Sequence, residues 1–196
     1  MKKYLLVNSI TALSLILGVT AIYYAVHGYT YPSFGFALLA FVSDSLDGYL
    51  ARRLKAESRF GAIFDTTADV FVYLIYPAVI LFNKFEMSNA VGIFFITIFL
   101  IAGIFRLIRF TANGFLTEGE KKYYLGMPVF FSHLIILIIM IMNVLDVTLV
   151  QIMGPLLLGT MSALMVTRIN FRKPTSTYLG IAMCIILMIS VSMFFI

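Results

Sequence analysis

Charged residues are scarce in this chain of 196 residues. Asp, Glu, Lys and Arg make up only 12% of it, whereas 62% is hydrophobic, and a soluble globular protein carries about 25% charged residues. Cysteine is nearly absent as well, and a single residue, Cys184, excludes an intramolecular disulfide. No internal repeat is evident, which argues against a transporter built from inverted repeats. With a mean hydropathy of +1.03, the composition predicts an integral membrane protein.

Long apolar segments make up most of the chain, and no long polar linker divides them. Each is near the ~20 residues that a membrane-crossing helix requires. We therefore expect an all-α integral membrane protein, a polytopic bundle of six to seven transmembrane helices in a single domain over residues 1–196. The expected spans are residues 5–26, 34–50, 62–82, 90–110, 129–145, 149–166 and 178–196.

Basic residues gather on one side of this expected bundle. In an alternating topology, Lys84 is the only one of the 14 on the other face. The positive-inside rule then predicts a cell membrane protein whose N-terminus faces the cytoplasm. A basic face beside anionic lipid headgroups accounts for the isoelectric point near 9.4 without a nucleic acid partner. No small-residue cleavage site follows the first apolar run cleanly, so we expect a retained helix and not a signal peptide.

Four aspartates interrupt the second and third apolar segments: Asp44, Asp47, Asp65 and Asp69. A carboxylate in hydrocarbon is costly unless it is paired or binds a ligand. Positions 44, 47, 48, 51 and 52 fall on one helix face, and 61, 65, 68 and 69 fall on one face of the next helix. Both faces begin at one short basic loop and extend roughly 12 Å from it, at 1.5 Å rise per residue. The four acids are therefore expected to converge near the cytoplasmic end.

Converging carboxylates repel one another unless they are protonated or cations bridge them, and a hard divalent ion such as Mg²⁺ or Mn²⁺ suits oxygen ligands. Two such ions about 4 Å apart can clamp a phosphate during displacement. Gly48, Ala51 and Gly61 leave room for a nucleotide or polyphosphate, and Arg52 supplies a positive charge. A proton or cation path would also place carboxylates in the membrane, but here all four lie at one end.

The run Asp44-x-x-Asp47-Gly48-x-x-Ala51-Arg52, followed after eight residues by Gly61-x-x-x-Asp65-x-x-x-Asp69, resembles the signature of the CDP-alcohol phosphotransferase family at all eight fixed positions. The resemblance implies a homodimeric membrane enzyme that moves a phosphatidyl group from a CDP-linked lipid to an alcohol and releases CMP. It implies two divalent cations held by the four aspartates, with Asp69 also acting as general base. A CDP site would be lined by Gly48, Ala51, Arg52 and Gly61.

Two further elements bear on the substrates. Asn8-x-x-Thr11 is similar to an element of the family's first helix near the nucleotide, although such residues also bond neighbouring helices. Three segments resemble phosphatidylserine synthases: residues 68–78, Arg106-Leu107-Ile108-Arg109-Phe110, and Leu125-Gly126-Met127-Pro128. Thr111 and Phe130 depart from the pattern of those enzymes.

Arg106 and Arg109 share a helix face, where they can hold a serine carboxylate or a phosphate, or anchor headgroups. We expect CDP-diacylglycerol and L-serine as substrates. Two alternatives stay open. One is a sibling enzyme that uses inositol phosphate, glycerol phosphate or another alcohol, and the other is a cation-coupled transporter.

Overall fold

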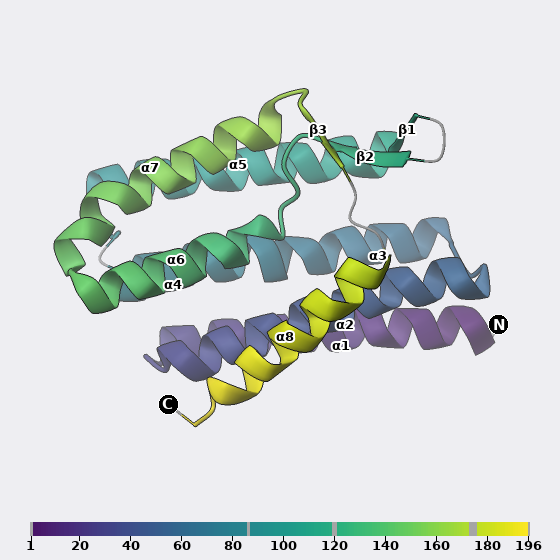
Figure 1. The fold of residues 1–196 in the computed structure, drawn as a ribbon, viewed down its shortest axis with the longest axis horizontal. Helices are drawn as coiled ribbons and strands as arrows, with labels where there is room; N and C mark the ends of the chain where they lie inside the picture. The colour runs from purple at the N-terminus through teal and green to yellow at the C-terminus, as the bar shows by residue number, and fades with distance from the viewer. Residues whose placement is uncertain (1, 86, 119–120, 173–175, 196) are drawn as a thin grey trace. The chain divides into compact units, whose positions relative to one another are not determined.

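The computed structural model describes residues 2–85, 87–118, 121–172 and 176–195, and almost all of them are helical (Figure 1). Three short strands lie among the helices. In chain order the elements are α1 (Lys2–Val26), α2 (Thr30–Leu54), α3 (Arg59–Asp69), the π-helix η1 (Val70–Ile75), α4 (Tyr76–Lys84), α5 (Ala90–Asn113), β1 (Leu116–Glu118), β2 (Lys121–Leu125), α6 (Phe131–Leu145), α7 (Val147–Val166), β3 (Asn170–Arg172) and α8 (Ser176–Ser192).

Within the described residues, five helical segments are long and apolar enough to cross a membrane. They are Lys2–Val26, Thr30–Leu54, Arg59–Lys84, Ala90–Asn113 and Val147–Val166, and two shorter apolar helices cover Phe131–Leu145 and Gly180–Ser192. Each expected span therefore corresponds to a helix, and the prediction of a polytopic all-α membrane protein is confirmed.

The third span is one continuous helical run with a π turn inside it. The wider turn of η1, Val70–Ile75, ends just before Pro77, which lies in the first turn of α4. Proline has no amide hydrogen and crowds the carbonyl four residues earlier, so a regular α-helix is disfavoured at that point. A π turn is one of the adjustments that helices make at such positions.

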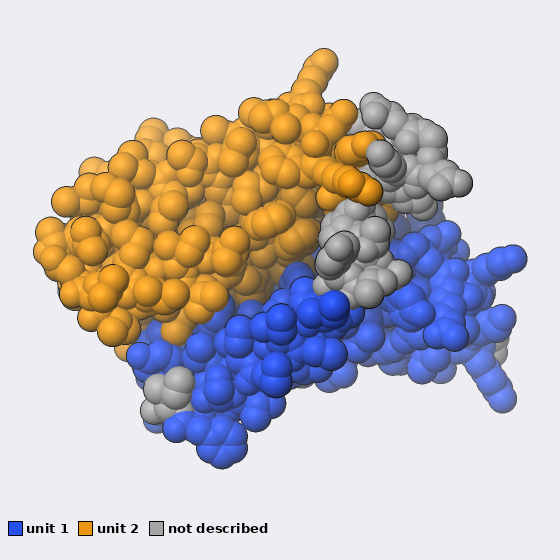
Figure 2. Space-filling model, viewed as in Figure 1, with its two compact units in different colours: residues 1–72, 176–196 blue, residues 73–175 orange. Residues whose placement is uncertain are grey.

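The chain forms two compact units, residues 1–72 with 176–196 and residues 73–175 (Figure 2). In the first unit, α1 and α2 lie side by side (Figure 1), and buried serines join the helices. Hydroxyl groups donate to backbone carbonyls of another helix at 2.8–3.0 Å, which is the kind of polar contact that holds membrane helices together. These bonds run from Ser14 to Ala40, from Ser33 to Ala21, from Ser43 to Ile10 and, from α8 to α2, from Ser190 to Gly35.

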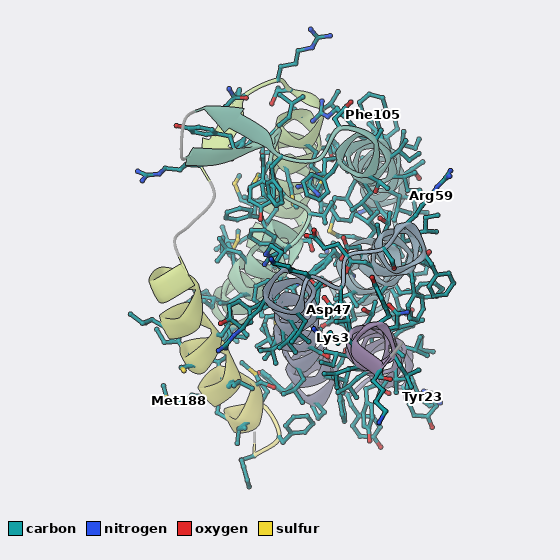
Figure 3. All side chains as sticks on the ribbon, turned by 90° about the vertical axis from the view of Figure 1, so that its right-hand side faces the viewer. Lys3, Tyr23, Asp47, Arg59, Phe105 and Met188 are labelled. Carbon is teal, nitrogen blue, oxygen red and sulfur yellow. The ribbon has the colours of Figure 1, made fainter. Side chains whose placement is uncertain are left out.

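Apolar side chains also cover the outside of the first unit, as expected for helices that face lipid. Tyr23 on α1 is 57% exposed and Met188 on α8 is 67% exposed, and both project from the helices in Figure 3. The buried interior combines small residues such as Ala21 and Ala37 with larger apolar ones such as Phe34.

The second unit packs α5 and α6 against α7 and places large side chains in its interior, among them Tyr73, Tyr76, Phe99 and Ile136. Small residues allow this close packing. Gly103 lies directly against Leu74, and a Cβ on Gly154 would be 3.1 Å from the sulfur of Met87.

A three-stranded antiparallel sheet in the second unit was not predicted from the sequence. Its order is β1-β2-β3, and Tyr124 of β2 pairs with Phe171 of β3. Strands of three to five residues carry little periodicity, and the β2–β3 pair joins segments that are distant in the sequence.

Candidate metal and nucleotide site

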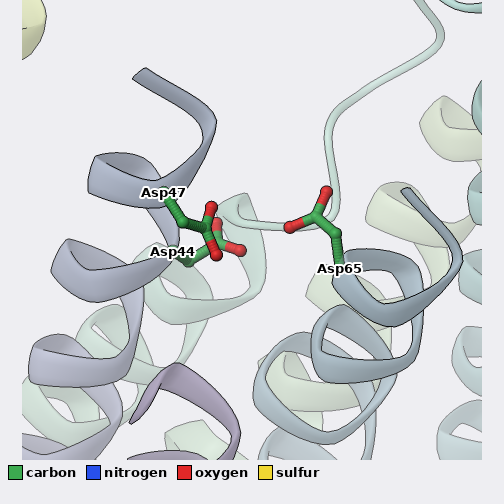
Figure 4. Close-up of side chains that lie close together, drawn as sticks. All are labelled: Asp44, Asp47 and Asp65. Carbon is green, nitrogen blue, oxygen red and sulfur yellow. The ribbon is translucent and has the colours of Figure 1, made fainter. Parts of the chain in front are cut away.

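Three aspartates of the first unit come together from two helices. Asp44 and Asp47 project from α2 toward Asp65 of α3 (Figure 4), and one carboxylate oxygen of each lies within 4.8 Å of the other two. Asp47 is buried, with 2% of its surface exposed, while Asp44 and Asp65 are partly buried. The spacing places Asp44 and Asp47 on one face of α2. After the short connection that follows Leu54, α3 packs against α1, and Asp65 faces the two α2 carboxylates (Figure 4).

The Asp47 carboxylate has one oxygen, Oδ2, that is buried and has no hydrogen-bond partner among the described residues. A buried carboxylate oxygen without a partner is costly, and a bound cation removes that cost. The neighbouring carboxylates of Asp44 and Asp65 complete an oxygen-only donor set of the kind that Mg²⁺ and Mn²⁺ prefer. The residues present therefore fit a divalent cation.

Asp69, the fourth aspartate of the motif, is the last residue of α3 and is partly buried. It follows Asp65 by one helical turn on the same face. It does not belong to the three-residue carboxylate group found among the described residues. The structure thus brings together three of the four predicted ligands, and the roles of Asp69 as ligand and base remain predictions.

Two glycines of the motif lie beside polar side chains. A Cβ on Gly48 would lie 3.4 Å from Nη1 of Arg52, which is exposed at the end of α2. A Cβ on Gly61 would lie 3.0 Å from Oγ of Ser58 and 3.3 Å from Oδ1 of Asn8. The space at Gly61 is therefore narrow, whereas a Cβ at Gly48 would make only an ordinary contact with Arg52. Both positions lie next to groups that can bind a nucleotide.

Local hydrogen bonds explain how these residues are held. Ser58 caps α3 by accepting a hydrogen bond from the Gly61 amide at 3.0 Å, a common way to satisfy a helix N-terminus. Ala51 is partly buried near the end of α2, and its carbonyl accepts a hydrogen bond from the Ala56 amide at 2.9 Å. Thr11 is buried and donates to the Val7 carbonyl of its own helix at 3.3 Å.

Sequence reasoning missed Ser43, the residue before Asp44. Its hydroxyl donates to the Ile10 carbonyl at 3.0 Å and so joins α1 to α2 next to the carboxylates. The only signal was a small polar residue within an apolar segment. Such a residue bonds a neighbouring helix more often than it binds a ligand.

The two arginines expected at the acceptor site lie on α5 in the second unit, and their surroundings differ. Arg106 is only 4% exposed, and the central carbon of its guanidinium lies 5.0 Å from the Phe110 ring centre and 5.8 Å from that of Tyr124. Arg109 is less buried, and its guanidinium donates to backbone carbonyls. The spacing of Arg106 and Phe110, one helical turn apart, was the available signal for the aromatic contact.

Comparison with known proteins identifies the family of this chain. Residues 4–196 match the family model described as CDP-alcohol phosphatidyltransferase, and the chain belongs to that family.

Among its relatives is a CDP-diacylglycerol–serine O-phosphatidyltransferase of Mycobacterium leprae, 32% identical over 63% of this chain and 42% of the relative. A protein of the same name from Methanocaldococcus jannaschii is 36% identical over 61% of this chain and 52% of the relative. An archaetidylserine synthase of Methanothermobacter thermautotrophicus is 32% identical over 47% of this chain and 39% of the relative. The chain spans about half the length of the curated relatives it matches.

Proposed function

We propose that this protein transfers the phosphatidyl group of CDP-diacylglycerol to the hydroxyl of L-serine, giving phosphatidylserine and CMP. The proposal rests on one observation: in a chain of this family, carboxylate oxygens of Asp44, Asp47 and Asp65 lie within 4.8 Å of one another. Serine is favoured as acceptor because relatives from a bacterium and an archaeon carry that activity in their names.

The four aspartates of the motif, Asp44, Asp47, Asp65 and Asp69, would hold two divalent cations, Mg²⁺ or Mn²⁺. Cations bound there would neutralise phosphate oxygens of the substrate. The buried Oδ2 of Asp47 without a hydrogen-bond partner supports this assignment, as does the absence of nitrogen or sulfur from the three-residue donor set.

The CDP moiety would lie along the motif faces of α2 and α3 and be lined by Asn8, Thr11, Gly48, Ala51, Arg52 and Gly61. The narrow space at Gly61 supports this placement, because a larger residue there would fill it. The Arg52 guanidinium is exposed beside Gly48, and such a group can donate paired hydrogen bonds to a phosphate.

The proposed reaction is a displacement at phosphorus. The Asp69 carboxylate accepts the proton of the serine hydroxyl while the serine oxygen attacks the lipid-side phosphorus. A new O–P bond forms, the bond from that phosphorus to the bridging oxygen breaks, and CMP leaves with the electron pair. A carboxylate held within hydrogen-bond reach of the hydroxyl can take this role of general base.

Arg106 would hold the carboxylate of the serine acceptor. Its burial and its two aromatic neighbours place the guanidinium in surroundings of low polarity, where binding of an opposite charge is stronger than in water. We further propose that the protein is a homodimer of the cell membrane, with its N-terminus and active site facing the cytoplasm. The one-sided distribution of basic residues supports this orientation.

An acceptor panel with the purified protein tests the proposal. CDP-diacylglycerol is incubated with Mn²⁺ or Mg²⁺ and with serine, inositol phosphate or glycerol phosphate, and CMP release and the lipid product are measured. We expect metal-dependent CMP release with serine and formation of phosphatidylserine. Faster turnover with another acceptor would overturn the choice of serine. No metal-dependent CMP release with any alcohol would overturn the transferase assignment and favour cation transport.

The same assay can compare lipid donors. An ether-linked CDP-archaeol is the informative alternative, because one relative is named archaetidylserine synthase. We expect faster turnover with the diacyl donor, in line with the names of the relatives that match over more of this chain.

A further inference from the structure

The Arg109 guanidinium donates hydrogen bonds to backbone carbonyls of the second unit. Nη1 donates to the Val166 carbonyl at 2.9 Å, and Nη2 donates to the carbonyls of Leu125 at 2.8 Å, Met165 at 2.7 Å and Thr167 at 3.3 Å. Three of these carbonyls lie at the end of α7, where the last carbonyls of a helix have no intrahelical partner and favour a positive charge. Arg109 thus joins α5 to the end of α7 and to β2.

Gly126 completes this arrangement. It is buried and has a φ of +77°, a conformation that glycine adopts at little cost. A Cβ at this position would overlap Nη2 of Arg109 and would lie 3.0 Å from the Thr167 carbonyl oxygen. The Gly126 amide donates to the Ile169 carbonyl at 2.9 Å, so the backbone after β2 lies directly against the guanidinium.

The same contacts lead to Arg106. Leu125, whose carbonyl binds Arg109, follows Tyr124, and the Tyr124 ring centre lies 5.8 Å from the Arg106 guanidinium. Tyr124 also packs against Phe110, at 5.9 Å between ring centres, and Phe110 is the other ring beside Arg106. A shift of β2 would therefore move one of the two rings that surround Arg106.

We propose that Arg109 is a positioning residue of the acceptor site. By binding the end of α7 and the Leu125 carbonyl it holds Tyr124 against Arg106, and Arg106 alone of the two contacts the acceptor carboxylate. This inference rests on the proposed function. It separates two arginines that occupy equivalent positions on one helix face.

Two measurements on the full-length protein test it, with Arg109→Gln, Arg109→Lys and Gly126→Ala as variants and Arg106→Lys for comparison. Hydrogen exchange of the Gly126 and Met127 amides, which donate to Ile169 and Leu164, is measured without substrate. The KM for serine and kcat are measured by CMP release.

We expect Arg109→Gln to speed exchange at these amides and to raise the serine KM roughly tenfold, with a smaller change in kcat. Gly126→Ala should do the same, because its Cβ would overlap the guanidinium and would lie 2.5 Å from the Met165 carbonyl oxygen that the guanidinium binds. In Arg109→Lys both the exchange rates and the serine KM should lie between those of Arg109→Gln and the unsubstituted protein, since an ammonium still donates to carbonyls. Arg106→Lys should raise KM while exchange changes little.

Faster exchange with an unchanged serine KM would overturn the inference and leave Arg109 a purely structural role. A raised KM with unchanged exchange would also overturn it, since Arg109 would then contact the acceptor itself. Failure of the proposed function is recognised separately, because the unsubstituted protein would release no CMP with serine. In that case the positioning role falls with the function, whereas the exchange data still report whether Arg109 holds the backbone.

Discussion

Asp47 on α2 and Asp65 on α3 place carboxylate oxygens within 4.8 Å of each other in two segments that can cross a membrane. Two like charges at this distance repel strongly in surroundings of low polarity. Asp44 joins the same group, which adds to the repulsion. The proposed cations offset it, and this relationship underlies the first prediction.

Asp47→Asn should weaken Mn²⁺ binding at least tenfold, because the loss of a residue that only supports a metal ligand already costs about 10–100-fold in affinity. The substitution nearly preserves shape but removes a charge from the donor set. Isothermal titration of the purified protein with Mn²⁺ measures the affinity, and CMP release should fall with it.

The control is Asp146→Asn. Asp146 caps α7 by accepting from the Thr148 amide at 2.8 Å, and asparagine caps equally well. Unchanged Mn²⁺ affinity in Asp47→Asn would contradict the assignment.

Asp69→Asn should lower kcat by roughly 10²–10⁴-fold, the usual contribution of a general base. Much of the binding of the CDP-lipid should remain, because the three-carboxylate group is intact. Single-turnover CMP release measures the chemical step, and equilibrium binding of CDP-diacylglycerol measures affinity. Full activity in this variant would refute the role of Asp69 as the base.

Gly92→Ala should lower the free energy of unfolding by about 1–3 kcal/mol, the usual cost of overpacking. The added Cβ would overlap the Met87 carbonyl in the turn between α4 and α5, and the Gly92 amide already bonds Oδ1 of Asn89 at 2.8 Å. Thermal unfolding in detergent measures the change. Gly180→Ala is the matched control, since within the described part of the chain no atom beyond its own helix backbone lies within 4 Å of its Cβ position, and it should stabilise slightly. Equal effects of the two substitutions would show that the turn at Met87 is not tightly packed.

Ser14→Ala should lower the free energy of unfolding by about 0.6 kcal/mol, the average found for hydrogen bonds between membrane helices. It removes the 3.0 Å bond that joins α1 to the Ala40 carbonyl of α2. Ser9→Ala is the comparison, because the Ser9 hydroxyl is exposed and bonds the Leu5 carbonyl of its own helix at 2.8 Å. Unfolding in detergent should separate the two variants. An equally large loss of stability in Ser9→Ala would mean that the hydrogen bond between the two helices contributes no more than a bond within one helix.

The helices were predictable because each apolar run is long enough to cross a membrane and ends at charged or turn-forming residues. The 62–82 run was expected as one span, and it corresponds to the continuous segment Arg59–Lys84. Its π turn was not predicted, although Pro77 marked an irregular position. The sheet was not predicted because its strands are short and because two helices, α6 and α7, separate β3 from β2 in the sequence.

The aspartate group was also predictable from local geometry. Helical spacing puts Asp44 and Asp47 on one face, and a short loop returns Asp65 to the same depth, so no long-range information is needed. The structure brings these three together. Asp69 shares the face with Asp65 but does not belong to the three-residue group found among the described residues, because helical spacing fixes the face of a residue and not the position of its carboxylate.

The sequence by itself determined the class of protein, its membrane helices and its aspartate motif, because helical periodicity and hydropathy are local properties. The different surroundings of Arg106 and Arg109 were decided only by the tertiary structure. In sequence the two are equivalent positions on one helix face, but Arg109 meets carbonyls that lie 16 and 56 to 58 residues away, and Arg106 meets the Tyr124 ring. Contacts between such distant segments depend on how α5, α7 and β2 pack, and no local pattern encodes that packing.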